Sequence, residues 1–346
     1  MRKSGAAPGS DPQLGGRSPG APRGYPRGRA ALFDLHVMVD WSARSHPSPA
    51  RECADAIWIG QARPDGPGET GYLRSRHAAV DYLADIAGAG AGARDQRVLI
   101  GFDFPFGYPQ GFAERVTGRA EALALWGWLA QAIEDGPDNA NNRFEVAEGL
   151  NAICGGTGPF WGRPEGASLP GLPARASARS GRGGLAERRI VEGRVRRAQP
   201  VWKLYTVGSV GSQALLGIPA VARLARAVPG AAIWPFETGL GPSGARVVLA
   251  ELYPGLIEAE VRRAQRATGD PIKDRVQVRL VAGALARLDA AGRLGELFGG
   301  APDLTAAERE IVAREEAWIL GAGFEAILRE AAGASAAPPG WEGRAA

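Results

Sequence analysis

The pattern of apolar residues along the chain predicts an α/β fold. Three short runs, 34–40, 96–103 and 246–252, are almost continuously apolar, as in strands buried on both faces of a sheet. Residues 54–61 alternate between apolar and polar side chains, which predicts a more exposed strand. The apolar run 231–236 is expected to lie beside 246–252 in the same sheet.

Helical periodicity, with apolar residues three or four positions apart, predicts the helices between these strands. The expected helices span 75–87, 119–134, 143–153, 212–228, 270–291 and 305–314. The longest begins at Asp270-Pro271, where the aspartate suits the N-cap and the proline the first turn.

Composition divides the chain into a folded region and two polar ends. Residues 1–30 are mainly Gly, Pro, Arg and Ser, cannot bury enough apolar surface to fold, and are expected to form a disordered extension. Residues 31–330 are expected to form one domain, interrupted at about 110–200 by a helical and irregular insert, with a candidate strand at 202–207. The small and polar residues of 331–346 predict a flexible tail.

Charge is distributed unevenly along the chain. The net charge is +4 and the pI is 9.3, but residues 1–30 hold six basic residues and one acid, so the remainder is nearly neutral. Residues 175–197 contain eight arginines and two glutamates. Such a segment either contacts a polyanion or forms a solvated loop, and the sequence is compatible with both.

Composition also excludes several classes of protein. No apolar run approaches the roughly 18 residues that span a membrane. No signal-peptide pattern is present, so a cytoplasmic protein without membrane contact is expected. Two distant cysteines exclude a disulfide framework and a cysteine-based zinc site, and three scattered histidines are too few for a histidine-rich metal site.

Four acidic residues carry the strongest functional signal. Asp40, Asp103 and Glu251 each end an apolar strand, and Asp274 lies in the first turn of the long helix. Each acid alone has an ordinary explanation as a turn or cap residue, but the carboxyl ends of neighbouring strands converge at one crevice. Clustered carboxylates are the ligands of hard cations such as Mg²⁺ or Mn²⁺. Paired metal ions of this kind hydrolyse phosphodiesters.

The order and strand placement of these acids resemble the ribonuclease H-like superfamily, and within it the DUF429 family of predicted nucleases. The segments that carry the resemblance are Val39-Asp40-Trp41-Ser42-Ala43, Gly101-Phe102-Asp103-Phe104-Pro105, Glu251-Leu252-Tyr253-Pro254 and Lys273-Asp274-Arg275.

The resemblance implies a ribonuclease H-like central mixed sheet flanked by helices, and a nucleic acid or nucleotide as substrate. It also implies that Asp40 ligates two metal ions, that Asp103 and Asp274 ligate one each, and that Glu251 is a ligand or a base.

Several residues depart from the family pattern or add to it. Lys273 and Arg275 flank Asp274 where paired acids are often found in the superfamily; they either weaken metal binding or hold a phosphate. Lys203 and Ser209 precede a helix whose first amides favour an anion, although an ordinary helix cap explains the serine as well.

Two other classes of function remain open from the sequence. The first is a nucleotide- or cofactor-handling enzyme on the sheet of actin and the sugar kinases, with 239–244 as a poor candidate for an adenosine loop. Some similar sequences are labelled as molybdopterin guanine dinucleotide synthesis proteins, although no motif here supports that label. The second class is a non-catalytic nucleic-acid-binding protein. Protein partners are unknown from the sequence.

Overall fold

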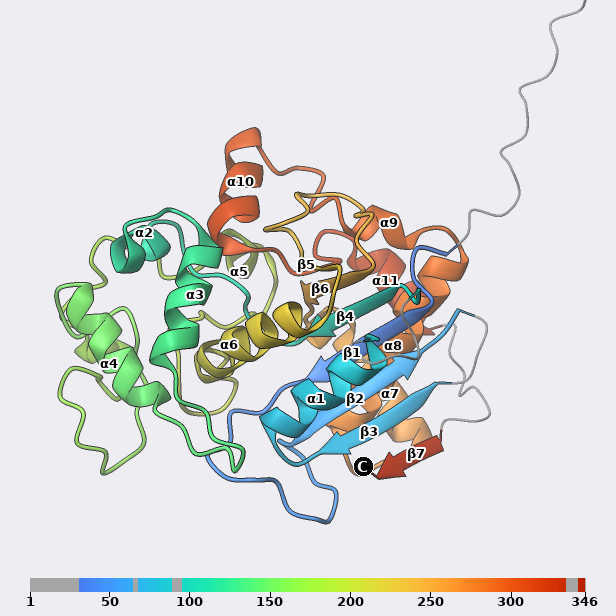
Figure 1. The fold of residues 1–346 in the computed structure, drawn as a ribbon, viewed down its shortest axis with the longest axis horizontal. Helices are drawn as coiled ribbons and strands as arrows, with labels where there is room; N and C mark the ends of the chain where they lie inside the picture. The colour runs from blue at the N-terminus through green and yellow to red at the C-terminus, as the bar shows by residue number, and fades with distance from the viewer. Residues whose placement is uncertain (1–30, 65–67, 89–94, 334–341, 346) are drawn as a thin grey trace, which may run out of the picture.

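The computed structural model describes residues 31–64, 68–88, 95–333 and 342–345, and its centre is one mixed sheet (Figure 1). Its strands are β1 (Leu35–Asp40), β2 (Ile57–Ala62), β3 (Glu69–Leu73), β4 (Val98–Phe102), β5 (Ala231–Ile233), β6 (Val247–Glu251) and β7 (Glu342–Ala345). Their order across the sheet is β5-β6-β4-β1-β2-β3-β7. Strands β1, β4, β6 and β5 are mutually parallel, whereas β2 is antiparallel to both β1 and β3.

The strand register fixes which side chains share a face of the sheet. Val39 of β1 lies opposite Phe102 of β4, and Phe102 lies opposite Glu251 of β6. Because successive side chains of a strand point to opposite faces, Asp40 is directed to the face opposite that of this row.

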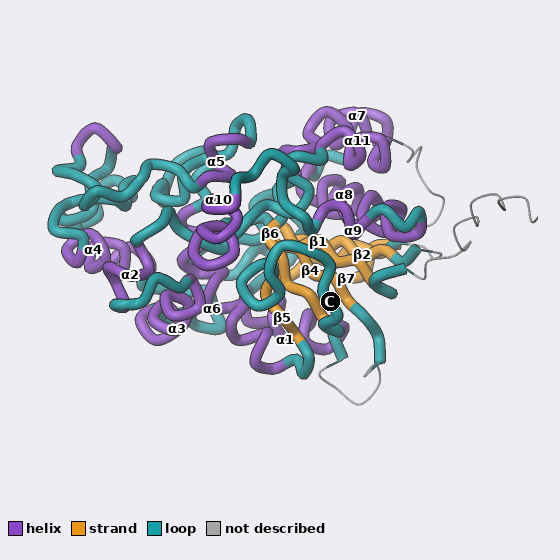
Figure 2. Tube along the Cα trace, turned by 90° about the horizontal axis from the view of Figure 1, so that it is seen from above, coloured by secondary structure: helices purple, strands orange, loops and turns teal. Residues whose placement is uncertain are grey.

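Two layers of helices cover the faces of the sheet (Figure 2). On one face lie α7 (Glu258–Thr268), α8 (Lys273–Ala290), α9 (Leu294–Leu297) and α11 (Glu325–Gly333). The other face is covered by α1 (Arg76–Ile86), α3 (Ala122–Ala132) and α6 (Gly211–Ala227). Each face has its own core, with Val37 and Val39 of β1 in one and Met38 in the other.

The insert holds α2 (Phe112–Thr117), α4 (Arg143–Ile153), α5 (Ile190–Arg194) and the 3-10 turn η1 (Ala176–Ala178). A second 3-10 turn, η2 (Pro254–Ile257), connects β6 to α7, and α10 (Ala306–Ile311) continues into the π-helical segment η3 (Val312–Glu316). The cores of α2, α3 and α4 are continuous with one face of the sheet, so the insert is packed onto the domain.

Helix α8 approaches the sheet closely because β2 carries a glycine at the crossing. A Cβ atom on Gly60 would lie 2.3 Å from the carbonyl oxygen of Val278, so any larger residue would push the helix away. The far end of α8 is held by Asp289, whose carboxylate accepts hydrogen bonds from the amides of Leu32 and Phe33 and contacts His36 at 2.9 Å. These contacts fix the position of α8 against β1.

The structure confirms the predicted α/β class and the adjacency of 231–236 and 246–252. It differs at 202–207, which forms turns and a single bridge instead of a strand. The predicted flexible tail contains β7, which pairs in parallel with β3 and adds an edge strand to the sheet.

The predicted disorder of 1–30 lies outside the described residues. Within the described residues, no helix combines the length and apolar character that a membrane crossing requires.

Candidate active site

Two aspartates meet at the carboxyl ends of adjacent parallel strands. Asp40 is the last residue of β1, and Asp103 directly follows β4. Asp40 is 8% exposed, and the charge of Asp103 is near enough to raise the pKa of Asp40. The Asp103 Oδ1 atom also accepts a hydrogen bond of 2.7 Å from the Trp41 amide.

The first turn of α8 brings a third carboxylate to the pair. Asp274 Oδ2 accepts a hydrogen bond of 2.9 Å from the Asp55 amide, which ties the helix to the loop between β1 and β2. One turn along α8, Gln277 donates a hydrogen bond of 2.8 Å from Nε2 to Asp40 Oδ2. The close crossing at Gly60 therefore sets the distance between the helix and the strand pair.

The three carboxyl groups resist ionisation together. Burial raises the pKa of Asp40 well above its ordinary value, and the charges of Asp103, Asp274 and Asp55 act in the same direction. Burial raises the pKa of Asp103 to about 7 against the opposing hydrogen bond from the Trp41 amide. Burial also raises the pKa of Asp274. A bound cation would relieve this mutual repulsion.

Asp40 and Asp274 line a cleft of about 520 Å³. Asp55 and Arg44 of the loop between β1 and β2, Arg143 of α4 and Tyr205 of the segment before α6 form other parts of its wall. Both signs of charge therefore face the same space, which suits a ligand that carries a cation and an anionic group.

The donor set fits a divalent metal in its chemistry. Carboxylate oxygens are the ligands preferred by Mg²⁺ and Mn²⁺. Among the described residues, no arginine or lysine hydrogen-bonds to Asp40, Asp103 or Asp274; Lys273 acts on Asp40 and Asp274 only through space. Within the same described ranges, no three acidic, histidine or cysteine side chains stand ready to ligate one ion. Metal binding would therefore require the Asp274 side chain to close on the aspartate pair.

No family model matches this chain, and no curated protein or solved structure shows significant similarity to it.

Glu251 lies away from the other three acids. It shares the row of Phe102 and Val39, and therefore projects to the opposite face of the sheet from Asp40. Arg189 binds both of its carboxylate oxygens, at 2.8 and 2.6 Å, and the Phe106 amide donates a further hydrogen bond of 2.9 Å. The sequence-based expectation that Glu251 joins the metal cluster is not met, because the pleat directs it into a buried ion pair.

That ion pair is part of a larger buried group. Arg189 also donates from Nε to Glu192 Oε1 at 2.8 Å and from Nη1 to the Glu316 carbonyl oxygen at 2.8 Å. Burial disfavours the Arg189 charge, but Glu251 and Glu192 more than offset this and raise its pKa. Arg189 therefore fastens the insert to β6.

The cations flanking Asp274 are engaged elsewhere. Lys273 pairs with Glu258 at 3.0 Å, and Arg275 pairs with Asp270 at 2.8 Å and with Glu52 at 2.5 Å. Neither is a free phosphate ligand in this conformation, and neither blocks the carboxylate between them.

Of the two weaker anion-binding candidates, only Ser209 lines the cleft. Lys203 donates from Nζ to the Val207 carbonyl oxygen at 2.8 Å and lies 5.9 Å from the centre of the Trp161 ring, so it braces the loop.

The glycine-rich segment 239–244 lies near the opposite end of the strands. Its Ser243 carbonyl oxygen accepts a hydrogen bond from Arg97, which precedes the first residue of β4. The poor candidate for an adenosine loop is thus far along the sheet from Asp40.

Most arginines of 175–197 serve the fold. Arg179 and Arg182 pair with Glu187, Arg188 donates to two backbone carbonyls, and Arg194 pairs with Asp303 and Glu308. Arg194, Arg196 and Arg197 line a second cavity, of about 600 Å³, together with Arg262 and Arg329. The paired arginines are therefore not part of a freely solvated loop. If the segment 175–197 contacts a polyanion, it does so through the arginines that line this cavity.

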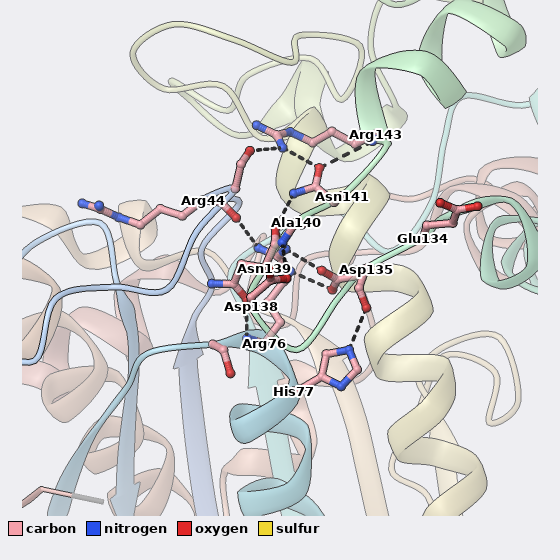
Figure 3. Close-up of polar contacts among 12 residues, drawn as sticks. Arg44, Arg76, His77, Glu134, Asp135, Asp138, Asn139, Ala140, Asn141 and Arg143 are labelled. Carbon is pink, nitrogen blue, oxygen red and sulfur yellow. Dashed lines mark hydrogen bonds and ion pairs between the residues drawn. The ribbon is translucent and has the colours of Figure 1, made fainter.

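A buried arginine holds the loop that carries the cleft wall (Figure 3). Arg76, which opens α1, is bound by both oxygens of Asp135, at 2.8 and 2.5 Å. Its Nη1 atom donates to the carbonyl oxygens of Ser42 and Arg44 at 3.2 and 2.7 Å. The loop after Asp40 is thereby locked to the insert through Arg76.

Sequence reasoning missed Gln277, Arg44 and Arg143 in the site. Gln277 lies three residues after Asp274, one turn along the predicted helix, and that spacing could have placed both on one face. No local signal marks Arg143, because the insert brings it to the cleft from far along the chain.

Proposed function

We propose that this protein is a divalent-metal-dependent phosphodiester hydrolase of ribonuclease H-like fold, which acts on nucleic acid. The observation that carries the proposal is that Asp40, Asp103 and Asp274 lie near enough for their charges to raise one another's pKa values, with no basic side chain hydrogen-bonded to any of them among the described residues. A structural role for such acids would ordinarily place a cation beside each, as Arg189 is placed beside Glu251.

The topology supports the same proposal at the level of the fold. The first strand is central, antiparallel to the second and parallel to the fourth, and an acid stands at the end of each of the two parallel strands. Helix α8 crosses the face to which Asp40 points and adds its own acid. This arrangement is compatible with the mixed sheet that the sequence resemblance implies.

In the proposed reaction the residues of the chain have separable roles. Asp40, Asp103 and Asp274 would hold Mg²⁺ or Mn²⁺, which when bound activates water and neutralises charge on the phosphoryl oxygens. Gln277 orients the Asp40 carboxylate through its hydrogen bond to Oδ2. Because burial raises the pKa of Asp103 to about 7, metal binding near neutral pH would displace a proton from this carboxyl group.

The test is cleavage of labelled single-stranded and duplex oligonucleotides with Mn²⁺. Asp40→Asn keeps the shape of the side chain and its partner Gln277, so we expect a folded protein without activity. Asp81→Asn, which alters an exposed aspartate on α1, is the matched control and should cleave as the wild type does. Undiminished cleavage by Asp40→Asn would refute the assigned role.

Neither alternative class is supported by a specific contact. A nucleotide-handling enzyme would use the same cleft, and thermal shift with ATP and Mg²⁺, against single-stranded DNA and Mn²⁺, separates the two. Static phosphate binding by Lys273 and Arg275 would require both to leave their ion pairs. Absence of metal binding by calorimetry would favour that non-catalytic protein.

A further inference from the structure

The insert delivers one buried arginine to the cleft. Arg143, the first residue of α4, is 7% exposed. Its Nε atom donates to Ser212 Oγ at 3.0 Å, and its Nη1 atom donates to Ser45 Oγ at 3.0 Å. Nη1 also donates to Asn141 Oδ1 at 2.6 Å (Figure 3). All of these partners are neutral. Among the described residues, Nη2 has no hydrogen-bond partner and the guanidinium has no ion pair.

The surroundings hold this cation rigidly without neutralising it. The guanidinium centre lies 4.2 Å from the centre of the Phe144 ring, which fixes its plane. Burial and the charge of Arg76 lower the pKa of Arg143 to about 10, and Glu145, Asp135 and Tyr205 oppose this only through space. Asp135 is bound to Arg76, so it is not a counter-ion for Arg143.

A buried charge without a counter-ion is costly unless a ligand supplies one. We infer that Arg143 and Arg44 form an anion subsite that holds a phosphate group of the substrate within the acid-lined cleft. The choice of phosphate over another anion rests on the proposed function, because metal-bound acids and a phosphate ligand belong to one substrate.

Arg44 and several hydroxyl groups complete the subsite. Arg44 donates from Nε and Nη2 to the carbonyl oxygens of Asp55 and Ala54, at 3.0 and 3.4 Å, and has no ion pair among the described residues. Ser45 and Ser209 line the same cleft. Guanidinium forks and hydroxyls are the usual partners of phosphate oxygens.

The subsite explains what the insert adds to the sheet. Arg143 comes from α4, and the exposed aromatic ring of Tyr205, 46% accessible, lies beside Phe144 with ring centres 6.4 Å apart. Tyr205 lines the same cleft and offers a surface on which a base can stack. The substrate unit is therefore a nucleotide of a nucleic-acid strand, held by its phosphate and base.

The test is titration of the full chain with inorganic phosphate and with thymidine 5′-monophosphate, in EDTA, by calorimetry. At about pH 6, below the Asp103 pKa of about 7, this carboxyl group is largely protonated and repels an anionic ligand less than at higher pH. Arg143→Gln should weaken both Kd values by about tenfold or more, because a charge-assisted hydrogen bond is lost. Arg119→Gln, an exposed arginine of the same insert, is the matched control and should leave them unchanged.

The binding measurements decide the inference. Unchanged phosphate binding by a folded Arg143→Gln variant overturns it, as does the absence of binding by the wild type. If Arg143→Gln does not fold, Arg44→Gln replaces it, and a several-fold loss supports the subsite whereas no loss overturns it. Cleavage is scored separately: binding that depends on Arg143 in a protein that cuts nothing supports the subsite and defeats the proposed hydrolase.

Discussion

Replacing Asp103 by asparagine should stabilise the protein at alkaline pH and not at acid pH. In the folded state Asp103 has a pKa of about 7, against an ordinary value of 3.8, chiefly because of burial. Between these values the folded state holds a proton that the unfolded chain has released, so unfolding releases a proton and stability falls as pH rises. Above pH 7 the folded protein bears the full free-energy cost of the ionised Asp103. Below the ordinary pKa of 3.8 this cost is absent, because the group is protonated in both states.

The size of the effect follows from the shift. A displacement of about three pH units corresponds to about 4 kcal/mol at most. Because the Asp103 side chain is partly exposed, solvent screening reduces this to about 2 to 4 kcal/mol. Asparagine removes the charge, and its amide oxygen can still accept the Trp41 hydrogen bond, so the variant should gain most of this energy at about pH 8.

The assay is urea denaturation of wild type and Asp103→Asn in EDTA at about pH 5 and pH 8. The difference between the proteins cancels the titration of groups that Asp103 does not influence, and it includes the response of Asp40, whose pKa the Asp103 charge raises. Asp81→Asn should show no such pH dependence. Equal stability of variant and wild type at pH 8 would refute the account of Asp103 as an acid whose pKa is raised by desolvation. Addition of Mn²⁺ should stabilise the wild type at pH 8 and the variant much less.

Three further predictions test other parts of the structure. Glu251→Gln should lower the free energy of unfolding by about 3 kcal/mol, because Arg189 loses a buried partner, and should leave the affinity for Mn²⁺ measured by calorimetry unchanged. Gly60→Ala should destabilise the fold by at least about 2 kcal/mol in urea denaturation, since its Cβ would meet the α8 backbone, whereas Gly127→Ala, on α3 with open space, should gain up to about 1 kcal/mol. Arg196→Ala should reduce the salt slope of oligonucleotide binding by about 1, and an unaltered slope would remove the second cavity from the binding surface.

Sequence alone located the strands that are buried on both faces, since β1, β4 and β6 are nearly continuous apolar runs. It did not locate α7, because most residues of that helix are polar or charged and only Val261 is buried. The extra strand β7 was missed for a similar reason, since a short polar segment pairs through its backbone. Tertiary contacts, and not local periodicity, decide both elements.

The four acids show that a carboxylate at the end of a strand does not by itself reveal which face of the sheet it occupies. Each apolar run ends on a carboxylate, but the face to which a side chain points depends on the register with neighbouring strands. Asp40 follows Met38 on the face covered by α8, whereas Glu251 follows Leu249 on the other face. The sequence shows which side chains within one strand share a face. It does not show the register between neighbouring strands, which decides whether two strand-end acids lie on the same face.

This difference in face separates a structural charge from a functional one. Glu251 is buried with an arginine that satisfies both of its oxygens, which is how a fold tolerates an internal carboxylate. Asp40 accepts a hydrogen bond from the Gln277 amide group, and Asp103 accepts one from the Trp41 backbone amide. These neutral donors orient the carboxylate oxygens without neutralising their charge. Their negative charge can therefore bind a cation. Arg143 lines the same cleft as Asp40, and its buried guanidinium can bind an anion. A metal–phosphate pair satisfies both demands at once, whereas either partner alone leaves one buried charge uncompensated.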